Sequence, residues 1–85
     1  MNRANLRDVI RCKLDNGDLP TKIPAEMDVR NGTGATCDAC GEPIQPAQSE
    51  HELTYPDVPR AFRLHFSCTT VWETQRRERG LDPAF

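Results

Sequence analysis

The spacing of apolar residues predicts a helix at the start of the chain. Apolar side chains recur there at intervals of three and four residues, which places them on one buried face. They are Leu6, Val9, Ile10 and Leu14. The Asn16-Gly17 pair is a helix stop signal, so we predict an N-terminal helix over residues 3–15, inside a segment of residues 1–17. Cys12 lies at the edge of the apolar face and is interpreted as a small core residue.

The next segment, residues 18–36, has no clear period. Prolines and glycines interrupt it, at Pro20, Pro24, Gly32 and Gly34. We interpret it as an irregular connection, because these residue types favour turns and loops over regular elements. Four apolar side chains, Leu19, Ile23, Met27 and Val29, are expected to hold this connection against the core.

Alternation of apolar and polar side chains predicts a β-hairpin in the second half of the chain. Residues 48–55 and 61–66 both alternate, and a Pro-Asp-Val-Pro turn separates them. In this interpretation Phe66 lies on the buried side of the second strand. His51 lies between two glutamates, so we expect it on the surface, with its charged form favoured.

After the hairpin the period becomes helical again. The side chains that follow the helical spacing are Cys68, Val71, Trp72 and Gln75. Ser67 is the expected N-cap of this second helix and Gly80 its expected end. Trp72 is expected to be buried in the core. The order of elements is helix, connection, hairpin and helix, which predicts an α+β fold.

Length and composition limit the chain to one small domain, residues 1–85. The chain has 85 residues, of which 36% are hydrophobic and 6% aromatic, so its core is modest. Domains of this size often need disulfides or a bound metal for stability. The chain has four cysteines, which allow either solution.

Two short motifs form a candidate metal site. Cys37-x-x-Cys40 has the spacing at which one turn of backbone aims two sulfurs at one point, and Gly41 lets the chain bend there. His65-x-x-Cys68 lies where the predicted strand meets the predicted helix, so both side chains share one face of the first turn. The hairpin between them brings the pairs together. We therefore predict that these four residues bind one metal ion.

Zinc is the metal that this ligand set favours. Three thiolates and one imidazole suit tetrahedral Zn²⁺, and four protein ligands leave no open position for a substrate. The charge of such a site is about −1, which makes the ion a poor Lewis acid. We therefore predict one structural Zn²⁺ in a zinc-finger core of residues 37–80. The alternatives are an iron–sulfur site, a redox pair at Cys37 and Cys40, unrelated buried thiols, and His51 as ligand in place of His65.

The ligand pattern resembles known zinc-finger families. A cysteine knuckle, a hairpin and a helix whose first turn supplies the last two ligands resemble a treble clef. The CxxC…HxxC set is similar to the first site of a LIM domain, although Cys12, the one cysteine left, cannot supply a second site. The run CDACGEPI (37–44) resembles the zinc knuckle of DksA/TraR-type regulators of bacterial RNA polymerase. The wider pattern consists of GDLP (17–20), GTGATCDACGEPI (32–44), HFSC (65–68) and Trp72-Glu73. It resembles small, mostly uncharacterised bacterial proteins over most of the chain, which implies a cytoplasmic treble-clef-like zinc protein with an added N-terminal helix.

The charge distribution bears on the partners. The net charge is −2, and residues 37–59 contain acidic residues but no lysine or arginine. The arginines of the last part of the chain are Arg60, Arg63, Arg76, Arg77 and Arg79. Because nucleic-acid binding normally needs a clear basic surface, we expect another protein as the partner. A nucleic-acid-binding or transcription-associated zinc finger is the alternative.

The expected role is that of a protein-interaction or regulatory module. No export signal and no run of ~18 apolar residues is visible, so we expect a cytoplasmic protein without membrane contact. HNH nucleases share the treble-clef plan but need a general-base histidine and further metal ligands on the helix. This helix instead carries an apolar stripe with Val71 and Trp72. We therefore expect neither an enzyme nor a small-molecule substrate.

Overall fold

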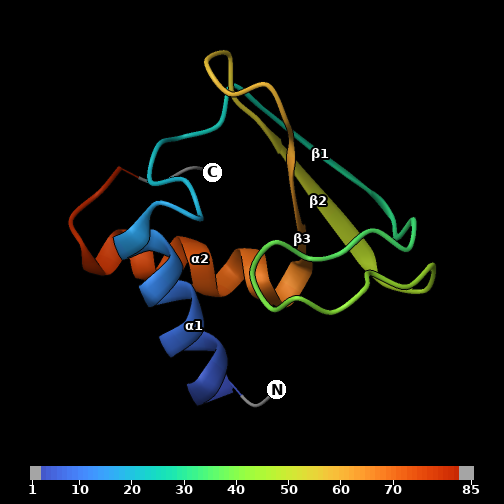
Figure 1. Cartoon of the computed structure of the whole chain (residues 1–85), viewed down its shortest axis with the longest axis horizontal. Coiled ribbons are helices and arrows are strands. Elements are labelled where there is room, and N and C mark those ends of the chain that lie inside the picture. Colours follow the sequence, from blue (N-terminus) through green and yellow to red (C-terminus); the bar gives the residue numbers. More distant parts are fainter. Residues whose placement is uncertain (1–2, 83–85) are drawn as a thin grey trace.

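The chain folds into two helices and a three-stranded sheet (Figure 1). The structure is a computed structural model that describes residues 3–82, with the side chains of residues 5–82. Its elements are α1 (Arg3–Asn16), β1 (Glu26–Asn31), β2 (Ser49–Thr54), β3 (Phe62–His65) and α2 (Phe66–Glu78). The predicted α+β class, both predicted helices and the predicted hairpin are confirmed. Within residues 3–82, no helix is both long and apolar enough to cross a membrane.

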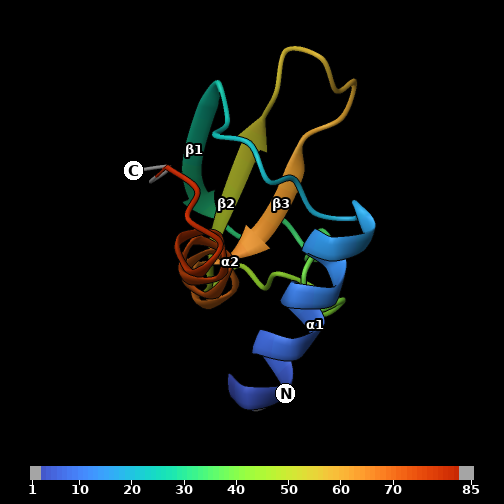
Figure 2. The same ribbon diagram turned by 90° about the vertical axis from the view of Figure 1, so that its left-hand side faces the viewer.

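The sheet is antiparallel, with the strand order β1-β2-β3. The register places Val29 and Leu64 on either side of His51. α2 packs against β2 and β3, and α1 packs against α2. Figure 2, in which α2 is seen end-on, shows both helices at the same end of the sheet. Because α2 packs against β2 and β3, it covers one face of the sheet. The other face carries polar side chains.

The core lies between α1, α2 and the covered face of the sheet. The predicted stripe of α1 is buried at Leu6, Ile10 and Leu14. The indole of Trp72 is completely buried and donates a hydrogen bond from Nε1 to the Pro20 carbonyl oxygen at 2.8 Å. Leu19 is buried and Met27 partly buried, as expected, which holds the segment after α1 against the core. The same prediction is wrong for Ile23 and Val29, which are 46% and 62% exposed.

The prediction that residues 18–36 are irregular throughout is wrong, because β1 lies within them. β1 pairs with β2 over its whole length, although most of its side chains are exposed. A bulge precedes it: the Ala25 N–H donates to the Thr54 carbonyl, opposite which Glu26 also lies. An edge strand with so few buried side chains gives little alternation to detect in the sequence.

Three local predictions are also corrected. Cys12 is exposed, because it lies just outside the face of α1 that packs against the core. Phe66 is 63% exposed, because the chain turns from strand into helix there and the alternation ends. The N-cap of α2 is His65 and not Ser67, and its side chain makes no capping hydrogen bond. Gly80, with φ +76°, follows the end of α2 as predicted.

A buried ion pair fastens the end of α2. Arg76 is almost fully buried, and its guanidinium donates to Glu73 Oε1 at 2.9 Å. It also donates to the carbonyl oxygens of Thr21 and Asp82, both at 2.8 Å. α2 is thereby joined to the segment after α1 and to the chain that follows it.

Candidate metal centre

The first cysteine pair lies on a tight turn. An isolated bridge between Thr36 and Pro43 closes the base of this turn. Inside it, the Cys37 N–H donates to the Glu42 carbonyl at 2.9 Å, and the Gly41 N–H donates to the Cys37 carbonyl at 3.0 Å. Gly41 has φ +81°, a conformation that glycine adopts without strain. The backbone therefore holds the two cysteines in the knuckle that the CxxC spacing predicted.

The second pair lies at the junction of β3 and α2. His65 is the last residue of β3 and has extended backbone angles, φ −63° and ψ 158°. Cys68 follows within the first turn of α2. Because the strand passes directly into the helix, both side chains project toward the knuckle.

The four predicted residues come together in one cluster. Their ligand atoms, one from each of Cys37, Cys40, His65 and Cys68, all lie within 4.8 Å of one another. His65 Nδ1 is 3.4 Å from Cys40 Sγ and 3.9 Å from Cys68 Sγ. Zn–S and Zn–N bond lengths in a tetrahedral site give ligand–ligand separations of about 3.5–3.8 Å. The group therefore fits a four-coordinate metal ion.

The histidine is oriented by a second contact. Its Nε2 lies 3.2 Å from the carbonyl oxygen of Pro43, which can only accept a hydrogen bond. We infer that Nε2 carries the proton, which leaves the lone pair of Nδ1 free to bind metal. A backbone carbonyl that fixes the tautomer in this way is a regular feature of metal-binding histidines. Sequence reasoning did not identify this role of Pro43.

The three thiols ionise unequally. A hydrogen bond from Cys68 lowers the pKa of Cys37 from 9.0 to about 4, although burial opposes this. The same hydrogen bond, with burial, raises the pKa of Cys68, and burial raises the pKa of Cys40. The protein thus stabilises one thiolate alone. Three adjacent thiolates need a cation that offsets their repulsion, which a bound divalent metal supplies.

Asp38, inside the knuckle, connects the site to the sheet. Its N–H donates to the Arg63 carbonyl, and its carboxylate accepts from the Arg63 N–H, both at 2.8 Å. The carboxylate also accepts a hydrogen bond from Arg60 at 3.1 Å. These bonds occupy the outer edge of β3 and align the knuckle with the strand that leads into His65.

The other candidate ligands lie elsewhere. Cys12 and His51 are outside the cluster. The prediction that His51 is a charged surface residue is wrong: it is 8% exposed, its ring lies against that of Phe66, and its Nδ1 has no hydrogen-bond partner within residues 3–82. Burial lowers its pKa from the ordinary value of 6.5. Its alternation with Leu53 and Tyr55, both buried, was the signal in the sequence that placed it on the covered face.

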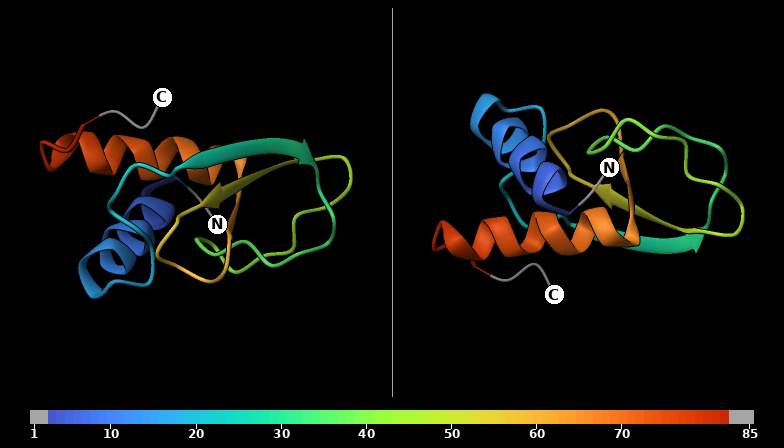
Figure 3. Two further views of the ribbon diagram at one scale, coloured as in Figure 1. Left: turned by 90° about the horizontal axis from the view of Figure 1, so that it is seen from above. Right: turned by 90° about the horizontal axis from the view of Figure 1, so that it is seen from below.

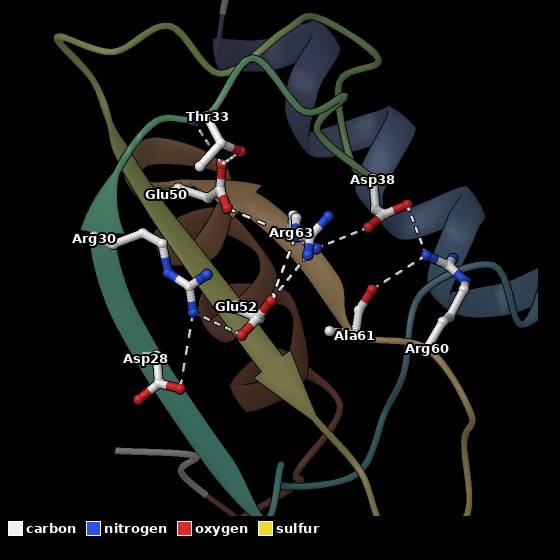
Figure 4. Close-up of polar contacts among 9 residues, drawn as sticks. All are labelled: Asp28, Arg30, Thr33, Asp38, Glu50, Glu52, Arg60, Ala61 and Arg63. Atoms are coloured by element: carbon white, nitrogen blue, oxygen red, sulfur yellow. Dashed lines mark hydrogen bonds and ion pairs between the residues drawn. The ribbon is translucent and has the colours of Figure 1, made fainter.

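The opposite face of the sheet carries a network of ion pairs (Figure 4). Arg30 and Arg63 both contact Glu52, at 2.7 and 3.2 Å. Glu50, which neighbours His65 across the strands, is fully buried and accepts two hydrogen bonds from Thr33, one of them at 2.8 Å. Sequence reasoning missed this buried carboxylate, because glutamate is rarely buried.

Comparisons of the chain with models of protein families, with curated proteins and with solved structures found no match. The functional interpretation therefore depends on the geometry of the site.

Proposed function

We propose that the chain is a treble-clef-like zinc finger in which one structural Zn²⁺ is bound by Cys37, Cys40, His65 and Cys68. The observation that carries this proposal is the convergence of the four ligand atoms within 4.8 Å of one another. A knuckle, a hairpin and the first turn of a helix contribute them, as in the treble-clef plan. The resemblance to small bacterial zinc proteins agrees with this assignment.

The proposed ion is structural. Three thiolates and one neutral imidazole fill a tetrahedral shell and give it a charge of about −1. When bound, the ion supplies cross-links between β3, α2 and the knuckle. Cys37 and Cys68 are both almost completely buried, which leaves little access to the ion from those sides.

We propose an interaction or regulatory module rather than an enzyme. Within residues 3–82, the cluster is the only group of three or more metal-binding side chains whose ligand atoms come together. A nuclease of the HNH type needs a general-base histidine beside a second ion, whereas His51 is packed against Phe66. A cytoplasmic location, where thiols stay reduced, remains part of the proposal.

The nucleic-acid alternative receives little support from the arginines. Four of the five at the end of the chain have a carboxylate partner: Arg60 with Asp38, Arg63 with Glu52, Arg76 with Glu73, and Arg79 with Asp15. Arg76 is also buried. Phosphate binding would have to break these pairs, so a protein partner is favoured. Titration of labelled DNA and RNA at low salt tests the alternative, and salt-dependent binding below ~100 μM would support it.

Native mass spectrometry tests the zinc proposal directly. We expect one Zn²⁺ per chain, and we expect serine at Cys37, Cys40 or Cys68, or alanine at His65, to abolish stoichiometric binding. Cys12→Ser is the matched control, since Cys12 is an exposed cysteine outside the cluster. A metal-free wild-type chain that remains folded would contradict the proposal.

A further inference from the structure

The two outer edges of the sheet differ. The edge of β3 is closed, because Asp38 bonds to both the N–H and the carbonyl of Arg63. The edge of β1 faces away from β2 and has no such cover within residues 3–82. Exposed strand edges carry unpaired donors and acceptors that can pair with another chain.

The register identifies the unpaired groups. The Gly32 N–H donates to the Gln48 carbonyl, opposite which Gly32 lies if the register of β1 and β2 is continued. Because bonded pairs recur at every second residue, Arg30, Asp28 and Glu26 also bond to β2. The N–H and C=O groups of the alternate residues therefore point outward. These residues are Met27, Val29 and Asn31, and no residue of the described range bonds to their outward groups.

A groove runs along this edge on the side covered by α2. Its volume is about 560 Å³, within the usual range for binding sites. Met27 and Val29 line it from β1, and Phe66 and Thr70 line it from α2. Val29 is 62% and Phe66 63% exposed, so its apolar lining is accessible. β1 and α2 overlap in projection when the molecule is seen from above (Figure 3), and residues of both elements line the groove.

The charge along the edge is negative. Glu26, at the mouth of the groove, has no cation partner within residues 3–82. Asp28 is 62% exposed in its side chain and lies 3.9 Å from Arg30, whose closer partner is Glu52 at 2.7 Å. Figure 4 shows Arg30 turned toward Glu52. Two carboxylates at the first half of β1 therefore remain available to a positively charged partner.

We propose that β1 binds an extended basic segment of another protein as a fourth strand of the sheet. The segment would bond to the outward groups of Met27, Val29 and Asn31. Its apolar side chains, at alternate positions, would fill the groove beside Phe66, and lysines or arginines between them would face Glu26 and Asp28. Strand addition of this kind derives affinity from the backbone and specificity from the alternate side chains. The inference rests on the proposed role as an interaction module and names the surface and the partner.

A random eight-residue peptide library displayed on phage, selected against the zinc-loaded full chain, tests this inference. We expect enrichment of peptides that alternate apolar residues with lysine or arginine. A synthetic copy of the most enriched peptide should slow amide exchange at Met27, Val29 and Asn31, since these N–H groups become bonded. No enrichment, or slower amide exchange confined to another surface, would overturn the proposal. Pairing of β1 with a second copy of the chain, seen as a doubled mass without peptide, would also overturn it.

Two pairs of variants separate the contribution of the backbone to peptide affinity from the contribution of charge. Val29→Pro removes an N–H that does not bond to β2, so the fold should persist while peptide affinity falls about tenfold. Val29→Thr keeps the N–H and should change affinity less than about threefold. Asp28→Lys should weaken binding of the basic peptide and reduce the salt dependence of that binding. Asp18→Lys, the same charge change at an exposed site after α1, should do neither.

Zinc content and far-UV circular dichroism accompany every binding measurement. A folded, zinc-loaded chain without peptide binding would overturn the docking surface and leave the proposed zinc finger intact. A folded chain that binds peptide without metal would overturn the zinc finger alone.

Discussion

Trp72 is the largest fully buried side chain of the described part of the chain. It joins α2 to the segment after α1 through its hydrogen bond to the Pro20 carbonyl. Trp72→Ala should lower the free energy of unfolding by about 3–5 kcal/mol, because it leaves a large cavity and an unpaired carbonyl. Urea denaturation of the zinc-loaded protein measures this loss. Trp72→Phe keeps most of the volume and should cost clearly less, and an alanine variant that loses under about 1 kcal/mol would contradict the assigned packing.

His51 should make stability depend on pH. Burial lowers its pKa from 6.5, so below this pH the unfolded chain binds a proton that the folded chain does not. The free energy of unfolding therefore falls as the pH decreases from about 6.5 toward the folded-state pKa, by at most about 1.4 kcal/mol per pH unit. His51→Phe lacks this proton, and urea denaturation at pH 7.5 and 5.5 should show a smaller loss for it. Equal losses in both proteins would contradict a buried neutral His51, because effects of acid on the metal site are common to both.

Single residues were the least predictable part of the structure. The predicted burial was wrong for both Cys12 and His51: the cysteine is exposed and the histidine is buried. Residue type favoured the opposite assignment in each case, since free cysteine is commonly buried and histidine flanked by glutamates commonly exposed. Their position on the helix face and on the strand decided the outcome. The clustering of the four candidate ligands was predictable because their spacing and chemistry agree.

Among the elements, β3 and the knuckle depend on each other through Asp38. Asp38→Ala removes the acceptor of the Arg63 N–H and should lower the free energy of unfolding by about 1–3 kcal/mol. The Arg63 amide should then exchange its hydrogen faster, which NMR can follow. Asp38→Asn retains an acceptor oxygen and should protect this amide better than alanine does. Unchanged exchange in the alanine variant would show that the knuckle does not close this edge.

The helices and the hairpin were predictable because each has a buried face with its own period. β1 was not, because only Met27 among its residues is even partly buried. Its place in the sheet is set by backbone bonds to β2 and by the pairing of Arg30 with Glu52, which are contacts between distant parts of the sequence. A window of local sequence contains neither. Because β1 pairs only with β2, it is also the open edge of the sheet.

At the scale of the whole molecule, the candidate metal site and the apolar core are parts of one buried cluster. Cys37, Ala39 and Cys68 belong to the same buried cluster as Ile10 and Trp72. The candidate ligands of the knuckle and of α2 therefore pack in the same core as the buried face of α1. The small apolar fraction of the sequence suggested that the core needs support from a metal site. The contacts between the site and the core could be identified only from the fold.

Removal of the metal should consequently unfold the whole domain. Zinc binding contributes roughly 10–16 kcal/mol of apparent free energy in small zinc fingers, which equals or exceeds the roughly 5–15 kcal/mol stability of a typical domain. Excess chelator at neutral pH should remove the helical circular dichroism signal and shift Trp72 emission to the red in one transition. Added Zn²⁺ should restore both, and Cys12→Ser should behave like the wild type. If the helices or the burial of Trp72 survived in metal-free protein, the apolar contacts alone would suffice for folding, and the ion would have another role.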